Sequence, residues 1–223
     1  PTGAGSLNAL ARGPKAAKTA GRAALAPSPA GRPPGGALVV PAVTEVAYRG
    51  LPAPVKATPL AKAPVADLSE QTPKGALPKI AADGREVWRV YGRPFKAPPG
   101  RVRLAVIVAG LGLSQAATKA AISRLPGAVT LAFDAYARKP GAAVDAARAA
   151  GHEVLLSLPM EPANFPVSDP GPLALLTDLE AKKNLERLER ILALAPGYVG
   201  LLQMMGSRFT TSEQALAPVL EAL

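Results

Sequence analysis

The chain of 223 residues contains no cysteine and one histidine, His152. Without cysteine it can form neither a disulfide framework nor a cysteine-ligated zinc site, and it has no thiol nucleophile. With one histidine it cannot supply two imidazole ligands to a metal, and a Ser-His-Asp triad would have to use His152. We expect His152 to be a structural residue, because it begins a strand on the side opposite the candidate site described below.

Long apolar stretches are also missing. No run of 18 uninterrupted apolar residues occurs, so we expect no transmembrane helix. No charged start followed by an apolar centre marks a signal peptide. The first residue is Pro1, inside a segment that reads as linker. We therefore interpret the chain as part of a longer protein, and we expect membrane attachment only through an anchor outside this sequence.

The positive charge is concentrated in the first 100 residues, which hold 14 basic and 5 acidic residues and 16 of the 25 prolines. Residues 1–76 are rich in Ala, Pro, Gly and Lys/Arg, which offer too little burial to offset the entropy of ordering, and we predict a disordered linker there. A basic arm for nucleic acid is the alternative. Tyr48 is the only aromatic residue in this segment, which leaves little for stacking on bases, so we expect no nucleic-acid partner.

Order is predicted from residue 77 onward, and residues 77–223 are assigned to one domain. Its first segment contains Trp88, Tyr91 and Phe95. In residues 87–91, Val87, Arg89 and Tyr91 alternate with Trp88 and Val90, which favours a short strand, and we expect the aromatic side chains to pack on the domain that follows.

From residue 103 onward, apolar runs alternate with helical patterns. The run RLAVIVAG (103–110) is typical of a strand buried on both faces. Thr177 and Glu180 match a capping box at the start of an amphipathic helix. The pattern as a whole predicts β-α-β-α-β-loop-α-β-α and a parallel sheet. We expect strands at 103–110, 128–133, 153–158 and 198–204.

Polar residues follow the ends of these strands, where parallel α/β proteins place their active sites. Asp134 and Glu161 are the candidate catalytic carboxylates, and Gln203, Ser207 and Arg208 are the candidate substrate-binding residues. Structural alternatives stay open: Glu161 and Arg208 could form an ion pair that joins two loops, and Asp134 could cap a turn.

A dinucleotide-binding site is a further hypothesis. Gly110 and Gly112 follow a strand and precede a helix, as that fingerprint requires. The third glycine is missing, because Gln115 stands in its place.

Several segments resemble the divergent polysaccharide deacetylase family in order and spacing. They include LPMEP (158–162), DPGPLALLT (169–177) and MGSRFT (205–210), and the likeness extends from about Leu77 to Leu223. The resemblance implies an α/β fold, a partial (β/α) barrel with about four parallel strands in this chain. Because four strands are fewer than the family's barrel of about seven, we expect that the domain is incomplete at its C-terminus.

The resemblance also implies chemistry. The related esterases hold a divalent metal such as zinc with Asp and His, and the metal activates water for deacetylation. At the corresponding positions this sequence has Ala109-Gly110, Ser157 and Met204, which are non-ligands or poor ligands. We therefore predict no metal or other cofactor. A divalent metal is expected only if the family's activity is retained, and whether the chain is an enzyme stays open.

The function predicted from these observations is that of a deacetylase-like protein with a degenerate metal site that binds a glycan or a cell-wall partner. An active metal-dependent deacetylase is the first alternative. The family implies a location in the periplasm or cell envelope of a Gram-negative bacterium.

Overall fold

A computed structural model describes residues 57–100 and 102–223 of the chain. All of these residues belong to one compact unit. Most of the predicted linker, residues 1–56, lies outside the described residues. Among the described residues, no helix is long and apolar enough to cross a membrane.

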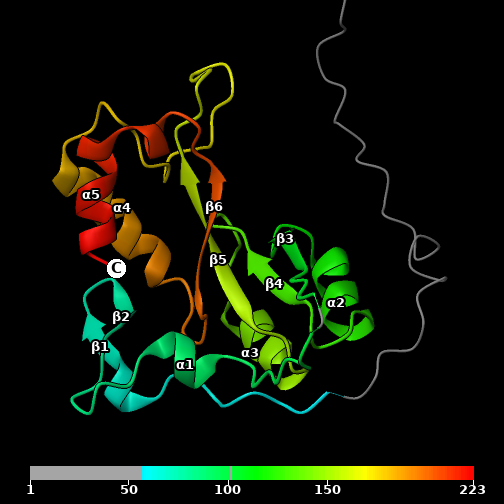
Figure 1. Ribbon diagram of the computed structural model, residues 1–223. Helices are drawn as coiled ribbons and strands as arrows, with labels where there is room; N and C mark the ends of the chain where they lie inside the picture. The colour runs from blue at the N-terminus through cyan, green and yellow to red at the C-terminus, as the bar shows by residue number, and fades with distance from the viewer. Residues whose placement is uncertain (1–56, 101) are drawn as a thin grey trace, which may run out of the picture. The chain divides into compact units, whose positions relative to one another are not determined.

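The helices and strands alternate along most of the described chain (Figure 1). In chain order they are a 3-10 helix η2 (Ala66–Leu68), β1 (Ser69–Thr72), β2 (Gly75–Pro78), α1 (Val87–Tyr91), β3 (Ile107–Leu111), α2 (Gln115–Arg124), β4 (Thr130–Phe133), α3 (Gly141–Ala149), β5 (Val154–Met160), α4 (Ala181–Leu192), β6 (Gly200–Met205), a 3-10 helix η3 (Phe209–Thr211) and α5 (Glu213–Glu221).

The main sheet has four parallel strands in the order β3-β4-β5-β6. Each strand therefore lies beside the next one in the sequence, as in a (β/α) barrel. A dinucleotide-binding fold instead reverses its strand order and binds its ligand where the order reverses. The sequential order thus confirms the predicted α/β class and partial barrel, and it contradicts the Rossmann-like alternative. In addition, the amide of Gly112 donates a hydrogen bond to Thr118 Oγ1 (2.8 Å), so it is not free for a phosphate.

The two central strands form the core. Leu131 and Phe133 of β4 and Leu156 of β5 have no exposed surface. Helix α4 covers them with Leu188 and Ile191, while its charged residues face outward. This is the amphipathic pattern that the sequence predicts for the helix.

Strand β3 departs from the prediction of a strand buried on both faces. It pairs with β4 alone among the described strands, so its other edge is uncovered. The apolar residues that lead into it are exposed, Val102 by 98% and Leu104 by 87%, and Ile107 within the strand by 43%. An apolar run shows that a strand could be buried, but its actual burial depends on which elements pack against it.

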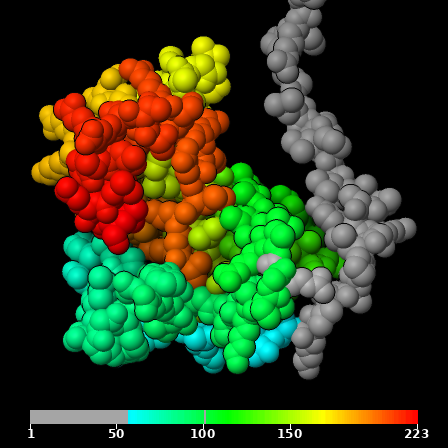
Figure 2. Space-filling view, in the orientation of Figure 1, coloured from blue at the N-terminus to red at the C-terminus, as the bar shows by residue number. Residues whose placement is uncertain are grey.

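The segment before the sheet differs from the prediction in two ways. Strands β1 and β2 form an antiparallel hairpin, so the predicted boundary between residues 76 and 77 falls inside a structured element. Residues 87–91 form helix α1 instead of a strand, because the amides of Arg89 and Val90 donate to the Glu86 carbonyl. In Figure 2 the C-terminal helix lies next to this hairpin, and Leu77 and Leu223 line the same groove.

One aromatic residue of this segment packs as predicted and two do not. Tyr91 is buried, and its hydroxyl accepts a hydrogen bond from the Val65 amide (2.8 Å). Trp88 and Phe95 are 53% and 72% exposed. A buried arginine also joins this segment to the rest of the domain. Arg148 of α3 donates hydrogen bonds to the carbonyls of Ala61, Tyr91 and Gly197.

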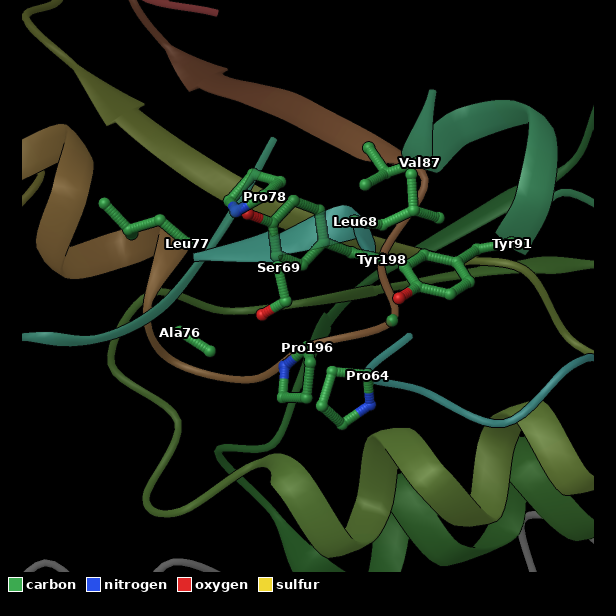
Figure 3. A pocket seen from close by; sticks show the side chains of 11 residues that line it. Pro64, Leu68, Ser69, Ala76, Leu77, Pro78, Val87, Tyr91, Pro196 and Tyr198 are labelled. Carbon is green, nitrogen blue, oxygen red and sulfur yellow. The ribbon is translucent and has the colours of Figure 1, made fainter. Parts of the chain in front are cut away.

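A small pocket lies where this segment meets the residues before β6 (Figure 3). Its walls are mainly apolar, and Ser69, Tyr91 and Tyr198 supply its hydroxyls. Burial raises the pKa of Tyr198, whose hydroxyl donates to the Leu192 carbonyl. The pocket is at the amino-terminal end of β6, opposite the end where the sequence places the candidate site.

Candidate functional site

The carboxyl ends of β5 and β6 are joined by backbone hydrogen bonds. The carbonyl of Glu161 accepts from the amides of Arg208 (3.0 Å) and Phe209 (3.1 Å). At the end of β6 the chain turns toward Arg208 through two left-handed residues, Met205 (φ 59°) and Gly206 (φ 86°). Left-handed backbone at a non-glycine residue is strained and is common at functional sites. This turn places the Arg208 side chain beside Glu161.

The side chain of Glu161 accepts three hydrogen bonds. Its Oε2 accepts from the amide of Thr177 (2.6 Å) and from the Thr177 hydroxyl (2.7 Å), and its Oε1 accepts from Arg208 Nη1 (2.9 Å). Glu161 is only 1% exposed. The three donors explain how a carboxylate can be ionised in this buried position. The predicted capping box is therefore not formed. The Thr177 side chain binds Glu161, and Glu180, the N-cap residue of α4, makes no side-chain cap.

The pKa of Glu161 reflects two opposing effects. Burial raises it, but the hydrogen bonds donated by Thr177 and the positive charge of Arg208 outweigh burial and hold it below the ordinary value of a glutamate. A general acid that works near neutral pH needs a raised pKa. The geometry therefore favours the interpretation in which Glu161 positions Arg208 and joins two loops.

Arg208 places a partly accessible positive charge beside Glu161. Its side chain is 48% exposed even though Nη1 is bound to Glu161. Its Nη2 lies 3.9 Å from Asp178 Oδ1, and Asp178 is itself 85% exposed. Since a guanidinium carries five N–H donors in a fixed plane, donors remain for a ligand.

Ser207 and Gln203 differ in what they offer to a ligand. Ser207 Oγ accepts from the Ala163 amide (2.9 Å), which leaves its hydroxyl proton free to donate. Gln203 Nε2 donates to the Met205 carbonyl (2.7 Å), so this side chain braces the left-handed turn. We call Glu161, Thr177, Ser207 and Arg208 the strand-end site.

Asp134 is not brought close to Glu161. Phe133 pairs with Leu156, so Asp134 lies level with Ser157, four residues before Glu161. At about 3.3 Å per residue this is roughly 13 Å along the strand. Asp134 Oδ1 accepts from the Tyr136 amide (2.9 Å), the turn-capping arrangement that the sequence left open. The two carboxylates therefore do not form a catalytic pair.

The loop between β5 and α4 is fixed by Tyr136. Its hydroxyl donates to the Pro170 carbonyl (2.8 Å) and accepts from the Leu173 amide (3.0 Å). Gly171 packs against the ring with a φ of +93°, and a Cβ there would lie 2.5 Å from the Tyr136 oxygen. This contact explains the glycine of DPGPLALLT, and neither Tyr136 nor Thr177 was predicted from its sequence context to serve the site.

The residues at the metal positions implied by the resemblance do not fit a catalytic cation. Ala109 and Gly110 have no ligand atom in a side chain, and a Met204 thioether is a poor ligand for a hard or borderline metal. Within residues 57–100 and 102–223, no three His, Asp or Glu side chains are grouped so that they could hold a metal ion. His152 is fully buried, and its ring nitrogens face the carbonyls of Val129 (2.8 Å) and Ile122 (3.3 Å).

The sequential parallel strands, with the polar site at their carboxyl ends, define a protein of the partial (β/α) barrel class. The sequence model of the divergent polysaccharide deacetylase family matches residues 106–223, more than half of the chain. The chain belongs to this family.

A solved structure supports the same fold. The crystal structure of the uncharacterised protein ATU2773 from Agrobacterium tumefaciens C58 is similar, with a TM-score of 0.64 and 40% sequence identity. The similarity covers 66% of this chain and 60% of that chain, so the present chain spans about three fifths of the length of that relative. No curated protein matches this chain.

Proposed function

We propose that this deacetylase-like protein binds a glycan or a cell-wall component at the strand-end site and has no catalytic metal centre there. The observation that carries the proposal is Arg208: Glu161 holds one end of its guanidinium group, while 48% of the side chain remains exposed. A fixed and accessible guanidinium is suited to the hydroxyl and carboxylate oxygens of a sugar.

The neighbouring residues support binding more than hydrolysis. Ser207 has a hydroxyl proton available beside Arg208. Glu161 has both carboxylate oxygens engaged, and its pKa is lowered, so it is poorly suited to donate a proton at neutral pH. The protein thus keeps the family's scaffold, and Glu161 holds the guanidinium group of Arg208 in place at the strand ends.

We further propose a periplasmic or cell-envelope location in a Gram-negative bacterium. The proposal is supported by the composition of residues 1–76, which is that of a Pro/Ala-rich spacer, and by the envelope location typical of the family that the sequence resembles. Fractionation of cells that produce the natural full-length protein tests it. Recovery in the cytosolic fraction would contradict the proposal.

Binding is tested by isothermal titration of the full chain with chito-oligosaccharides and with soluble peptidoglycan fragments. We expect Arg208→Gln to weaken binding by about tenfold, the loss of one charge-assisted contact, and Arg208→Lys to restore part of it. Arg190→Gln on the exposed face of α4 is the matched control. Equal affinities for the parent and Arg208→Gln would refute the role of the strand-end site.

Metal-dependent deacetylation is the second candidate, and membership of the family favours it. Acetate release from acetylated chito-oligosaccharides, measured with and without added zinc, distinguishes the two functions. We expect no release above background. Release that Glu161→Gln abolishes in a folded variant would establish the hydrolase instead.

A further inference from the structure

A groove between α2 and α3 has the properties of a second binding surface, separate from the strand-end site. The two helices are in contact with each other (Figure 1). The groove is lined by residues of both helices and of the loops that precede them, among them Lys119, Ile122, Arg138, Lys139, Ala143 and Ala146.

The charge of this groove has one sign. Lys119, Arg138 and Lys139 line it, and no acidic residue does. None of the three forms an ion pair with another described residue. Asp145, an acidic residue of α3, lines a different groove with Arg148. Three exposed cations without local partners attract an anionic ligand.

The groove contains no aromatic side chain, and its uncharged lining includes the polar residues Gln115, Thr118 and Ser123. We call its aliphatic part, Ile122 of α2 and Ala143 and Ala146 of α3, the floor. Small aliphatic side chains can take up the branched side chains of a peptide, whereas a sugar ring would find no aromatic surface to stack on. An apolar floor with a charged rim is the general form of a groove that binds an amphipathic segment.

The backbone at the rim is also unusual. Lys139 has a φ of +50°, a left-handed conformation that lysine seldom adopts. The next residue, Pro140, is the N-cap of α3 and makes no side-chain cap. The chain therefore holds a lysine in a strained conformation at the point where the loop enters the groove.

We propose that the α2/α3 groove, defined by these lining residues, docks an acidic amphipathic segment of a partner protein. Apolar side chains of the segment occupy the floor, and its carboxylates pair with Lys119, Arg138 and Lys139. The docking surface does not depend on the proposed glycan binding, because the two use different residues.

Fluorescence anisotropy with the full chain tests the proposal. The probe is a dye-labelled synthetic peptide of Leu and Glu at helical spacing, and the comparison peptide has Gln in place of every Glu. We expect the Lys119→Gln/Arg138→Gln/Lys139→Gln triple variant to bind the Glu peptide at least about tenfold more weakly, through loss of three rim charges. The control variant Lys96→Gln/Lys182→Gln/Arg190→Gln removes the same charge from exposed positions elsewhere and should bind within about twofold of the parent.

A second pair of variants separates local charge from folding. Ala146 is an exposed residue of the floor, so Ala146→Glu places a carboxylate within the groove and Ala146→Gln places a side chain of equal size without charge. We expect the Glu variant to bind the acidic peptide more weakly than the Gln variant, with equal melting temperatures. The proposal would be overturned if the two triple variants bound the Glu peptide equally, or if the parent bound the Glu and Gln peptides equally. It would also be overturned if heparin, DNA or anionic vesicles bound more tightly than the Glu peptide at the same three residues.

Discussion

The ion pair at the strand-end site makes a quantitative prediction for Glu161→Gln. The substituted amide can still accept from Thr177 through its oxygen, but its NH₂ group then faces the donor of Arg208. Two charge-assisted bonds become neutral, at a cost of about 1 kcal/mol each. Loss of the Arg208 ion pair adds about 0.5 kcal/mol to this cost, a small value because the Arg208 side chain is half exposed. We expect the variant to lose about 2–3 kcal/mol of unfolding free energy at pH 7.

The pH dependence of this loss tests whether the ionised carboxylate of Glu161 is its cause. Because the folded protein holds the pKa of Glu161 below its unfolded value, the stabilisation is fully present above the ordinary glutamate pKa of about 4.3 and is lost as the pH falls through the folded value. The difference between parent and variant should therefore be constant from about pH 7 to pH 5.5 and should shrink below about pH 4.3.

Urea denaturation at a series of pH values measures both quantities. Glu221→Gln is the control, since Glu221 is exposed and has no ion pair with another described residue, and it should change stability by less than about 0.5 kcal/mol. A Glu161→Gln variant as stable as the parent at pH 7, or a difference that grows as the pH falls, would refute the reasoning.

Two further predictions concern the residues that hold the fold around the site. Arg148→Ala should destabilise the protein by about 3 kcal/mol in urea denaturation, because Arg148 is 2% exposed and its loss leaves the carbonyls of Ala61, Tyr91 and Gly197 without their donor. The control Arg124→Ala, at an exposed position of α2, should change the stability little. Equal losses of stability in the two variants would contradict the role of Arg148. Gly171→Ala should lower stability by about 2 kcal/mol, since a Cβ meets the Tyr136 oxygen at 2.5 Å. In a Tyr136→Ala background the same change should cost less, and an unchanged cost would show that backbone conformation alone is responsible.

The fold could be predicted from the sequence where local pattern and final environment agree. Residues 128–133 and 153–158 become the central strands β4 and β5, whose apolar runs are covered by neighbours on both sides, and residues 198–204 become the edge strand β6, which pairs with β5. The same reasoning overestimates the burial of β3, since a strand's pattern does not say whether both of its edges are paired. A pattern of five residues is also too short to decide between strand and helix, and at 87–91 the carbonyl of Glu86 selects the helix.

The candidate site could be predicted only in part. Glu161, Ser207 and Arg208 are marked by their positions after buried strands, and the structure brings these three together. Gln203 and Asp134 share that sequence context, yet one braces a turn and the other caps one. Sequence spacing predicts a helix cap at Thr177 because it describes only local partners, and the carboxylate that Thr177 binds lies 16 residues earlier.

Isothermal titration of the full chain with zinc, cobalt and manganese tests the central claim most directly. Because alanine, glycine, serine and methionine stand at the positions where the family's metal ligands are expected, we expect no stoichiometric binding tighter than that of exposed carboxylates. Tight binding of one cation per chain, lost in variants of the domain's own carboxylates such as Asp134→Asn, would contradict it.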